Sequence, residues 1–375
     1  MSRGLGDVYK RQSERIKMNN KAVIAMSGGV DSSVAAYLMK QRGFDCIGVT
    51  MKLFANEDIG ISREHSCCSL DDVEDARSVA YSLDMPYYVF NFSDRFETDV
   101  IDRFVHAYEN GITPNPCIDC NRYLKFDKLY MRAKELDRDY VVTGHYARVE
   151  KDENGRFLLK KALDDTKDQS YVLHCLTQEQ LSHTIFPLGE MRKSQAREIA
   201  ESQGFINARK ADSQDICFVQ NGSYADFIEQ YTGKNYPDGD FLDTNGNVIG
   251  RHKGVIRYTV GQRKGLGISA PEPLYVKAVN PVSNTVTLSY NDGLYSSVVK
   301  AGDINLISVP EIKGEMRVKA KVRYRHTEQW ATVTQNGETL TAVFDEPQRA
   351  VTCGQALVLY DGDTVVGGGT IIEVE

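Results

Sequence analysis

The sequence has no apolar run that approaches the ~20 residues a helix needs to cross a bilayer, and it has no internal repeat or low-complexity segment. It also has no surplus of basic residues. Its 45 Lys and Arg stand against 52 Asp and Glu, a formal net charge of −7, which argues against a protein that coats nucleic acid. A local basic face for RNA remains compatible with that balance. No signal peptide accompanies the eight cysteines, so we expect reduced thiols in a cytoplasmic protein, available for catalysis or metal binding.

At 375 residues the chain is long enough for two or three domains. Its 41% hydrophobic and 26% charged residues are typical of a globular protein with a sizeable core. Residues 1–17 are left out of the fold prediction. Ser2 to Gln12 match the translation of a sequencing adapter, so we expect the native chain to start near Met18.

A glycine-rich stretch, Ser27 to Ser33, follows an apolar run from Lys21 to Met26 that is typical of a buried strand. The residues after it, Val34 to Lys40, have apolar positions at helical spacing. A strand, a glycine turn and a helix N-terminus together favour an anion site, because free N–H groups point at the ligand. No Lys follows the glycines, which excludes the G-x-x-x-x-G-K-[ST] phosphate loop. The pattern S-G-G-x-D-S instead matches the pyrophosphate-binding loop of ATP pyrophosphatases, so we expect it to bind ATP.

Short apolar runs alternate with helical stretches up to about residue 210. Further strands are expected at Cys46–Met51, Tyr87–Phe92 and Asp139–Gly144, and helices at Leu70–Leu83 and Phe96–Glu109. This alternation predicts an α/β domain over 18–210 with a doubly wound parallel sheet, whose ligand lies at the carboxyl ends of the strands.

The pattern changes after about residue 210, where glycines become frequent and short alternating runs are separated by turn signals such as Asn336-Gly337. We therefore predict two smaller β-rich domains. The first is a central domain over 211–294 and the second a C-terminal β-barrel over 295–375 that contacts RNA.

Three cysteines favour sulfur chemistry beside the ATP loop. Cys117 and Cys120 form a C-x-x-C, and Cys217 lies far along the chain. No second C-x-x-C or closely spaced His pair completes a four-ligand zinc site. Two interpretations remain open: a persulfide carrier with a partner thiol, or three ligands of an iron–sulfur cluster with one open iron.

Taken together, the motifs resemble those of the bacterial tRNA-specific 2-thiouridylases, which convert the wobble uridine of certain tRNAs to 2-thiouridine. The resemblance runs from about Lys21 to the C-terminus, and the order and spacing of its motifs are specific. Besides the glycine-rich loop it includes Thr113–Pro116 with Cys120-Asn121, Thr143–Arg148, Lys167–Leu173, Phe186–Gly189, Ser213–Phe218, Tyr258–Gly267 and Thr352–Gln355.

The resemblance implies ATP-dependent 2-thiolation: adenylation of the C2 oxygen of uridine, then sulfur transfer, with release of AMP and pyrophosphate. It makes Cys120 the catalytic nucleophile and Cys217 the persulfide carrier. It assigns ATP binding to Ala25, Met26, Ser27, Gly28, Gly29, Val30, Asp31, Ser32, Met51 and Gly144. It assigns tRNA contacts to Asn115, Pro116, Cys117, His145, Lys167, Asp168, Gln169, Arg323, Tyr324 and Gln355.

The implied cofactors are ATP and Mg²⁺, and the implied partners are tRNA and a protein that donates persulfide or sulfide. Many members of the family have Asp where this chain has Cys117. That departure keeps open a [4Fe–4S] cluster held by Cys117, Cys120 and Cys217.

Two other functions compete with this one. Another adenylating enzyme with the same loop, such as an amide-forming synthetase, needs neither the cysteines nor an RNA-binding barrel. A non-catalytic, ATP-dependent tRNA-binding protein needs no turnover. Several basic residues of the β-rich half suit either a solvated face or contacts to tRNA phosphates. They are Arg257, Arg263, Lys264, Arg323 and Arg325.

Overall fold

The computed structural model describes residues 20–54, 70–212, 216–219 and 223–375. The segment interpreted as adapter-derived, residues 1–17, lies outside them. No helix in the described part of the chain is both long enough and apolar enough to span a membrane.

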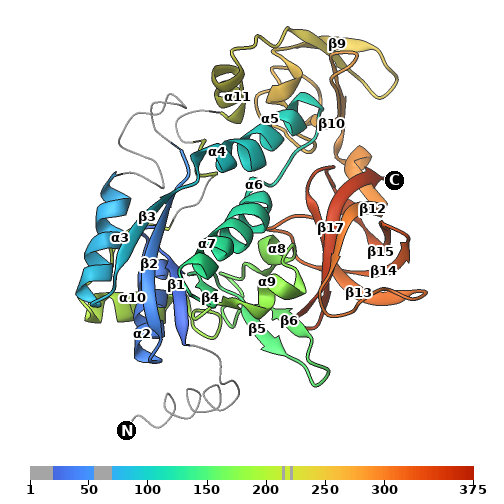
Figure 1. The fold of residues 1–375 in the computed structure, drawn as a ribbon. Helices are drawn as coiled ribbons and strands as arrows, with labels where there is room; N and C mark the ends of the chain where they lie inside the picture. The colour runs from blue at the N-terminus through green and yellow to red at the C-terminus, as the bar shows by residue number, and fades with distance from the viewer. Residues whose placement is uncertain (1–19, 55–69, 213–215, 220–222) are drawn as a thin grey trace.

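The first part of the chain forms a five-stranded sheet in the order β3-β2-β1-β4-β7, with every neighbouring pair parallel (Figure 1). The expected strands are confirmed within a residue or two, and a short edge strand is added to them. The bounds are β1 Lys21–Ala25, β2 Asp45–Lys52, β3 Tyr87–Asn91, β4 Tyr140–Val142 and β7 Thr184–Ile185. The doubly wound parallel sheet predicted from the sequence is therefore present.

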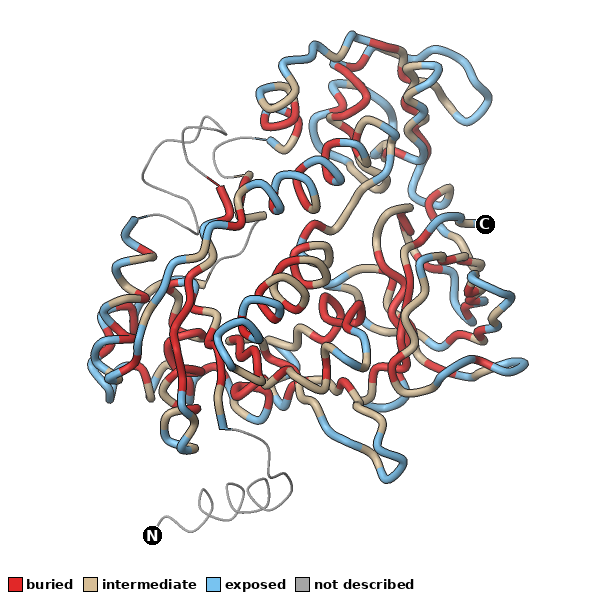
Figure 2. The backbone as a smooth tube through the Cα atoms, in the orientation of Figure 1, coloured by how far each residue is buried: buried red, intermediate tan, exposed pale blue. Residues whose placement is uncertain are grey.

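Helices cover both faces of this sheet because alternate residues of a strand point to opposite sides. Ala22 and Ile24 of β1 belong to one core, and Val23 belongs to another. The first core is shared with α2 (Val30–Gln41), α3 (Leu70–Ser82) and α10 (Lys193–Ser202). The second is shared with α5 (Asp102–Glu109), η2 (Cys120–Lys128) and α7 (Leu129–Glu135). Figure 2 shows the central strands buried between these two layers.

The single helix expected over Phe96–Glu109 starts earlier and is interrupted. It consists of α4 (Ser93–Phe96), a π-helical turn η1 (Glu97–Ile101) and α5. A second π-helical segment, η2, follows the short helix α6 (Pro116–Asp119) and begins at Cys120. Such wide turns are rare and occur often at functional sites.

A small central region follows the parallel domain. Helix α11 (Tyr224–Thr232) precedes a four-stranded sheet in the order β10-β11-β8-β9. Phe241, Val276 and Val286 form the centre of its own hydrophobic core. The strand bounds are β8 Gly239–Leu242, β9 Val248–His252, β10 Tyr275–Asn280 and β11 Thr285–Ser289, and short 3₁₀ turns lie at Val255–Arg257 (η3) and Asn291–Leu294 (η4).

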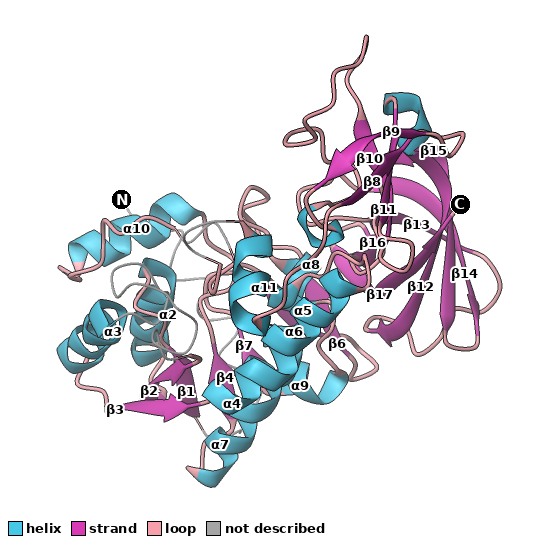
Figure 3. Cartoon of the chain, turned by 90° about the horizontal axis from the view of Figure 1, so that it is seen from above, coloured by secondary structure: helices cyan, strands magenta, loops and turns pink. Residues whose placement is uncertain are grey.

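The C-terminal strands close into an antiparallel barrel, as predicted. The chain of neighbours β12-β15-β14-β13-β16-β17 is closed by direct pairing of β12 with β17 (Figure 3). The bounds are β12 Tyr295–Leu306, β13 Met316–Lys321, β14 Gln329–Asn336, β15 Thr339–Arg349, β16 Ala356–Asp361 and β17 Thr364–Val374.

The barrel is attached to the first part of the chain by an element that the sequence analysis missed. A hairpin of β5 (Arg148–Lys151) and β6 (Phe157–Lys160) extends the barrel sheet through one pairing, Thr364 with Lys160. Buried polar contacts reinforce this junction. Two short helices, α8 (Ser170–Leu173) and α9 (Gln178–Ser182), follow the hairpin. The hydroxyl of Tyr171 in α8 donates to the Ala356 carbonyl of the barrel at 2.9 Å.

Candidate active site

The glycine-rich loop connects the carboxyl end of β1 to the N-terminus of α2. Gly28 has φ +75°, and a Cβ there would lie 2.4 Å from the Asp72 carbonyl oxygen, so only glycine fits. The Ser32 hydroxyl donates to the Gly29 carbonyl at 3.0 Å and accepts from the Ser27 amide at 3.2 Å. These bonds fold the loop around the start of α2, where free N–H groups favour an anion.

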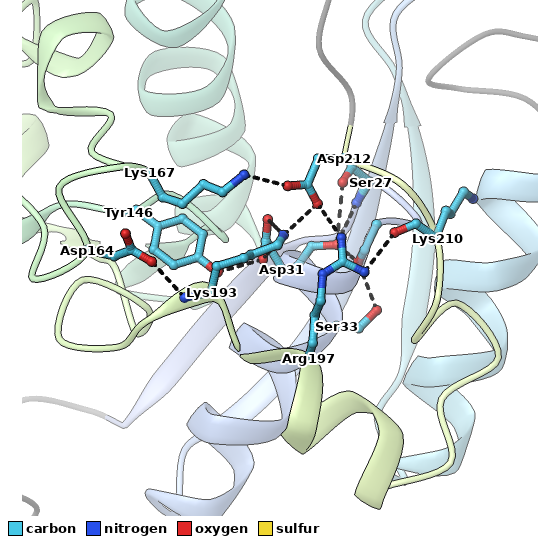
Figure 4. A network of polar contacts seen from close by, with 12 residues as sticks. Ser27, Asp31, Ser33, Tyr146, Asp164, Lys167, Lys193, Arg197, Lys210 and Asp212 are labelled. Atoms are coloured by element: carbon cyan, nitrogen blue, oxygen red, sulfur yellow. Dashed lines mark hydrogen bonds and ion pairs between the residues drawn. The ribbon is translucent and has the colours of Figure 1, made fainter. Parts of the chain in front are cut away.

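Asp31 of this loop lies in a network of ion pairs with residues far along the chain (Figure 4). The Lys193 ammonium donates to both Asp31 oxygens at 2.8 Å and contacts the Asp212 carboxylate, also at 2.8 Å. The Tyr146 hydroxyl donates to Asp31 at 2.8 Å. Lys193 is only 8% exposed, so its charge is stabilised mainly by these two carboxylates.

Asp212 forms ion pairs with three basic side chains. Lys167 pairs with it at 2.8 Å and Arg197 at 3.0 Å, in addition to Lys193. Burial by itself would raise the pKa of Asp212, but hydrogen bonds from Lys167 and Lys193 outweigh it and lower the pKa to about 2. The network therefore places the ammonium groups of Lys167 and Lys193 beside the glycine loop, where a polyphosphate could compete for them.

Two residues shortly before Asp212, Asn207 and Lys210, form hydrogen bonds with the glycine-rich loop. The Asn207 amide nitrogen donates to the Gly28 carbonyl and to the Ser33 hydroxyl, both at 2.9 Å. Asn207 is 3% exposed, and its Oδ1 atom is buried with no hydrogen-bond partner. Lys210 donates to the Gly28 carbonyl at 3.3 Å and pairs with Asp72 at 2.6 Å.

The residues expected to bind ATP lie where three strands end. Ala25 ends β1 and Met26 follows it, Met51 is near the end of β2, and Gly144 follows β4. A Cβ on Gly144 would lie 2.7 Å from the Asp31 carbonyl carbon and 2.8 Å from the Ser32 amide nitrogen. The fold therefore brings Gly144 against the glycine loop. Occupation of this site by ATP stays a prediction that the polar groups of the site support.

The close approach at Gly144 gives a testable prediction. Gly144→Ala should weaken ATP binding by at least about tenfold, because the methyl group must displace the loop at a cost of about 1–3 kcal/mol. Titration calorimetry with a non-hydrolysable ATP analogue measures the effect. Gly302→Ala is the control, since its nearest neighbour would be an ordinary 3.6 Å from the new Cβ. Equal ATP affinity in the two variants would contradict the placement of ATP on this loop.

Cys117 and Cys120 lie on the turn that leads into η2. The Asn115 side chain caps α6 by accepting from the Cys117 amide at 3.2 Å, and Pro116 occupies the first helical position. Cys120 is 8% exposed and begins the π-helical segment. The next residue, Asn121, fixes this turn by donating to the Val172 carbonyl at 2.9 Å.

Cys117 and Cys120 differ in their surroundings. Cys117 is exposed, yet the protein atoms crowded around it raise the pKa of its thiol, against a smaller opposing effect of Lys125. Cys120 instead packs in the core below the turn.

Cys217 borders the same core as Cys120. Its neighbour Phe218 is buried, with ring centroids 5.7 Å from Phe96 and 5.1 Å from both Phe104 and Phe227. This aromatic anchor places the half-buried Cys217 against the core that includes Cys120.

The three cysteines do not form a metal site in the part of the chain described. Among residues 20–54, 70–212, 216–219 and 223–375, no three His, Cys, Asp or Glu side chains are arranged to hold a metal ion. The expectation that Cys117, Cys120 and Cys217 together ligate a cluster is therefore not supported by the geometry.

Several of the residues expected to contact tRNA form hydrogen bonds within the protein. His145 accepts or donates a 2.7 Å hydrogen bond with the Thr143 hydroxyl, and burial lowers its pKa well below the usual value, so the imidazole is neutral. The Gln169 side chain accepts from the Tyr146 amide at 2.9 Å. Asp168 accepts from the Ser170 hydroxyl at 2.7 Å, which closes its loop.

Two of the residues expected to contact tRNA, Tyr324 and Gln355, belong to the C-terminal barrel region and contact the first part of the chain. The Tyr324 hydroxyl donates to the Asp168 carbonyl at 3.2 Å. The Gln355 amide donates to the carbonyls of Thr113 and Pro114, at 2.9 and 3.2 Å, directly before the cysteine turn. Lys167 points instead to Asp212 and so belongs to the network beside the nucleotide loop.

Sequence reasoning missed Lys193, Asn207 and Lys210, which contact the nucleotide loop. None of them lies in a motif, and each contact with the loop spans more than 160 residues. The nearest signal is the Phe186–Gly189 motif shortly before Lys193.

Comparison with known proteins gives near full-length matches. Residues 20–221 match the family described as tRNA methyl transferase HUP domain, 225–290 the tRNA methyl transferase PRC-barrel domain, and 296–371 the Aminomethyltransferase beta-barrel domain. The tRNA-specific 2-thiouridylase MnmA of Clostridioides difficile (strain 630) is 51% identical over 356 residues, covering 94% of this chain and 98% of that relative.

A second relative, the tRNA-specific 2-thiouridylase MnmA of Lachnoclostridium phytofermentans, is 51% identical and covers 94% of this chain and 99% of its own. Among solved structures, an NMN synthetase from Francisella tularensis aligns with 61% of this chain and 83% of that chain. Its sequence identity to this chain is 16% and the TM-score is 0.35.

Proposed function

The chain belongs to the family of tRNA-specific 2-thiouridylases, and from this premise we propose that it replaces the C2 oxygen of the wobble uridine of tRNA by sulfur, with ATP as the activating substrate. The observation that supports this most directly is that the nucleotide loop lies in one ion network with Asp212, close to Cys217 in the sequence. Asp212, five residues before Cys217, contacts the same Lys193 ammonium as Asp31.

In the first step the C2 oxygen of the uridine attacks the α-phosphorus of ATP, and pyrophosphate leaves. Adenylation is needed because a carbonyl oxygen is a poor leaving group, whereas AMP is a good one. The N-terminus of α2 and the ammonium of Lys193 stabilise the negative charge that develops on the phosphates. Asp31 is the carboxylate in this loop suited to hold a Mg²⁺ ion, which would neutralise phosphate charge when bound.

In the second step sulfur reaches C2. We propose that Cys217 carries a persulfide whose terminal sulfur attacks C2, and AMP leaves with the former C2 oxygen. Cys120 then attacks the Cys217 sulfur, and the electron pair of the broken S–S bond stays on the sulfur bound to C2. The products are 2-thiouridine and a Cys120–Cys217 disulfide, which an external dithiol must reduce before the next cycle. In a variant of this route Cys120 releases the terminal sulfur first, as hydrosulfide, which then attacks C2.

The iron–sulfur alternative requires Cys117, Cys120 and Cys217 around one cluster, with sulfide delivered from an open iron. Because the described side chains do not converge in that way, the proposal follows the thiol route and leaves Cys117 as a neighbour of the target base. Iron and acid-labile sulfide in protein purified without oxygen test this point. About four of each per chain, lost on replacement of any of the three cysteines, would contradict the thiol route.

Pyrophosphate release tests the function itself. The proposal predicts release from ATP only when tRNA is added, followed by 2-thiouridine when a persulfide donor is present. Release without tRNA, driven by a small carboxylate, would instead indicate an amide-forming synthetase. Binding of tRNA with no release of pyrophosphate would indicate a binding protein. The donor is expected to be a protein that carries persulfide or sulfide.

A further inference from the structure

Two arginines and a histidine meet where the barrel faces the central region. Arg323 and His326 follow β13, and Arg349 ends β15. The His326 amide donates to the Arg323 carbonyl at 3.2 Å, so the two residues form one turn. Arg349 lies over the ring of Tyr275 in β10, with 4.9 Å from its guanidinium carbon to the ring centroid. The cluster therefore includes both β-rich regions.

The Arg323 guanidinium has hydrogen-bonding capacity that the described residues do not use. Its Nη2 atom is buried and has no hydrogen-bond partner. The same atom lies 3.6 Å from the position that a Cβ on Gly261 would occupy, at the turn of the central region. A buried guanidinium nitrogen with no acceptor is costly unless a ligand supplies one.

No carboxylate of the described residues forms an ion pair with Arg323 or Arg349. Arg349 uses its Nε atom to donate to the Asn291 side chain at 2.8 Å, a neutral acceptor. Burial, and then the charge of Arg349, lower the pKa of Arg323, and burial with both arginines lowers the pKa of His326. The cluster thus has positive charge that the protein leaves uncompensated, although its net charge is −7.

Two other arginines of the β-rich half, Arg257 and Arg317, are neutralised by carboxylates. Arg257, which the sequence analysis grouped with possible phosphate contacts, pairs with Asp226 and with Glu229, both at 2.8 Å. Arg317 of the barrel pairs with Asp345. Arg257 and Arg317 thus differ from Arg323 and Arg349, which have no such carboxylate among the described residues.

The cluster adjoins the cysteine turn. Tyr324, next to Arg323, contacts the loop of Asp168, and the pKa of its phenol is raised by burial, then by Asp168 and by Cys117. Gln355, six residues after Arg349, contacts the two residues before Asn115. A nucleotide whose base reaches Cys117 would bring its neighbouring backbone phosphate to these arginines.

We propose that Arg323 and Arg349, with His326 beside them, form a binding site for a backbone phosphate of tRNA next to the target uridine. The choice of tRNA as the source of this phosphate rests on the proposed function. An arginine pair suits a phosphodiester because each planar guanidinium can donate two parallel hydrogen bonds to its oxygens. Arg349 and His326 are thereby added to the residues expected to contact tRNA.

Equilibrium binding of tRNA between about 50 and 300 mM KCl tests the site. The slope of log affinity against log salt concentration should become shallower by about 1 in Arg349→Gln and in Arg323→Gln, and binding at low salt should weaken about tenfold. Arg317→Gln is the matched control, with the same change of charge on the same barrel at a residue already paired with Asp345. Unchanged affinity for an ATP analogue shows that each variant is folded.

A wild-type slope in both Arg349→Gln and Arg323→Gln would overturn the proposal, and so would an equal loss of slope in Arg317→Gln. Conversion of uridine to 2-thiouridine by the wild-type protein is measured alongside. If the wild type converts uridine and the variants keep its slope, only the phosphate site is wrong. If the wild type converts no uridine, the proposed function fails whatever the variants bind.

Discussion

Cys217→Ser is expected to reduce formation of 2-thiouridine by at least about a thousandfold while tRNA-dependent release of pyrophosphate continues. Serine cannot carry a persulfide, so no sulfur reaches the activated base. The glycine loop and its ion network involve no thiol, so adenylation is unaffected. The two activities are measured in one reaction, by nucleoside analysis of the tRNA and by a pyrophosphate assay.

Cys120→Ser should lose turnover to a similar extent but should stop at a different stage. The persulfide on Cys217 still forms, and the bond between its sulfurs cannot be cleaved by a serine hydroxyl. Protein linked through Cys217 to tRNA is therefore expected to accumulate and to be released by added dithiol.

Cys46→Ala is the matched control for loss of a thiol. Cys46 is 2% exposed, belongs to the core on the α2 face of the sheet, and burial raises the pKa of its thiol to about 12, so it should be inert. Thiolation by Cys217→Ser at a rate near that of Cys46→Ala would contradict the assignment of Cys217 as the sulfur carrier.

Lys193→Met is expected to lower the rate of tRNA-dependent pyrophosphate release about a hundredfold. Methionine keeps the length of the side chain but removes the ammonium between Asp31 and Asp212, so two carboxylates repel each other beside the phosphates. The variant should also lower the free energy of unfolding by about 2 kcal/mol. This is less than the loss expected on breaking a fully buried ion pair, because the Lys193–Asp31 pair is only partly buried. Single-turnover kinetics and chemical denaturation measure the two effects separately.

Arg197→Gln separates the role of Lys193 from a general loss of charge. Arg197 contacts Asp212 at 3.0 Å and the Lys210 carbonyl at 3.3 Å, with no bond to Asp31. Its replacement should cost less than tenfold in rate. If Arg197→Gln and Lys193→Met lose rate equally, the Lys193–Asp31 contact has no special part in activation.

Local patterns were sufficient for most of the fold. The buried runs that became β1 and β2 are short and apolar because both faces of a parallel sheet are covered, and the acidic start of α3 suits a helix N-terminus. The two-residue strand β7 has too few residues to show a period. The pairing of β6 with β17 depends on Thr364 meeting Lys160, a contact with no local signature. The π-helical turn of η2 depends on packing in the same way.

The candidate site could likewise be predicted only where its residues are contiguous in the sequence. The glycine loop and the C-x-x-C are contiguous, and their chemistry follows from residue type and spacing. Lys193 and Asn207 reach the loop across more than 160 residues, so only the folded chain reveals them. The sequence also grouped Arg257 with Arg323, and the structure separates them because only Arg257 lies beside carboxylates.

The most direct test of ATP activation coupled to two-thiol transfer is the yield of 2-thiouridine from iron-free protein whose Cys217 has been charged with polysulfide. With ATP and tRNA but no reductant, the account predicts about one 2-thiouridine per chain, together with a Cys120–Cys217 disulfide, and repeated turnover once a dithiol and more polysulfide are added. Product formed without ATP, or product only after iron is restored, would contradict it.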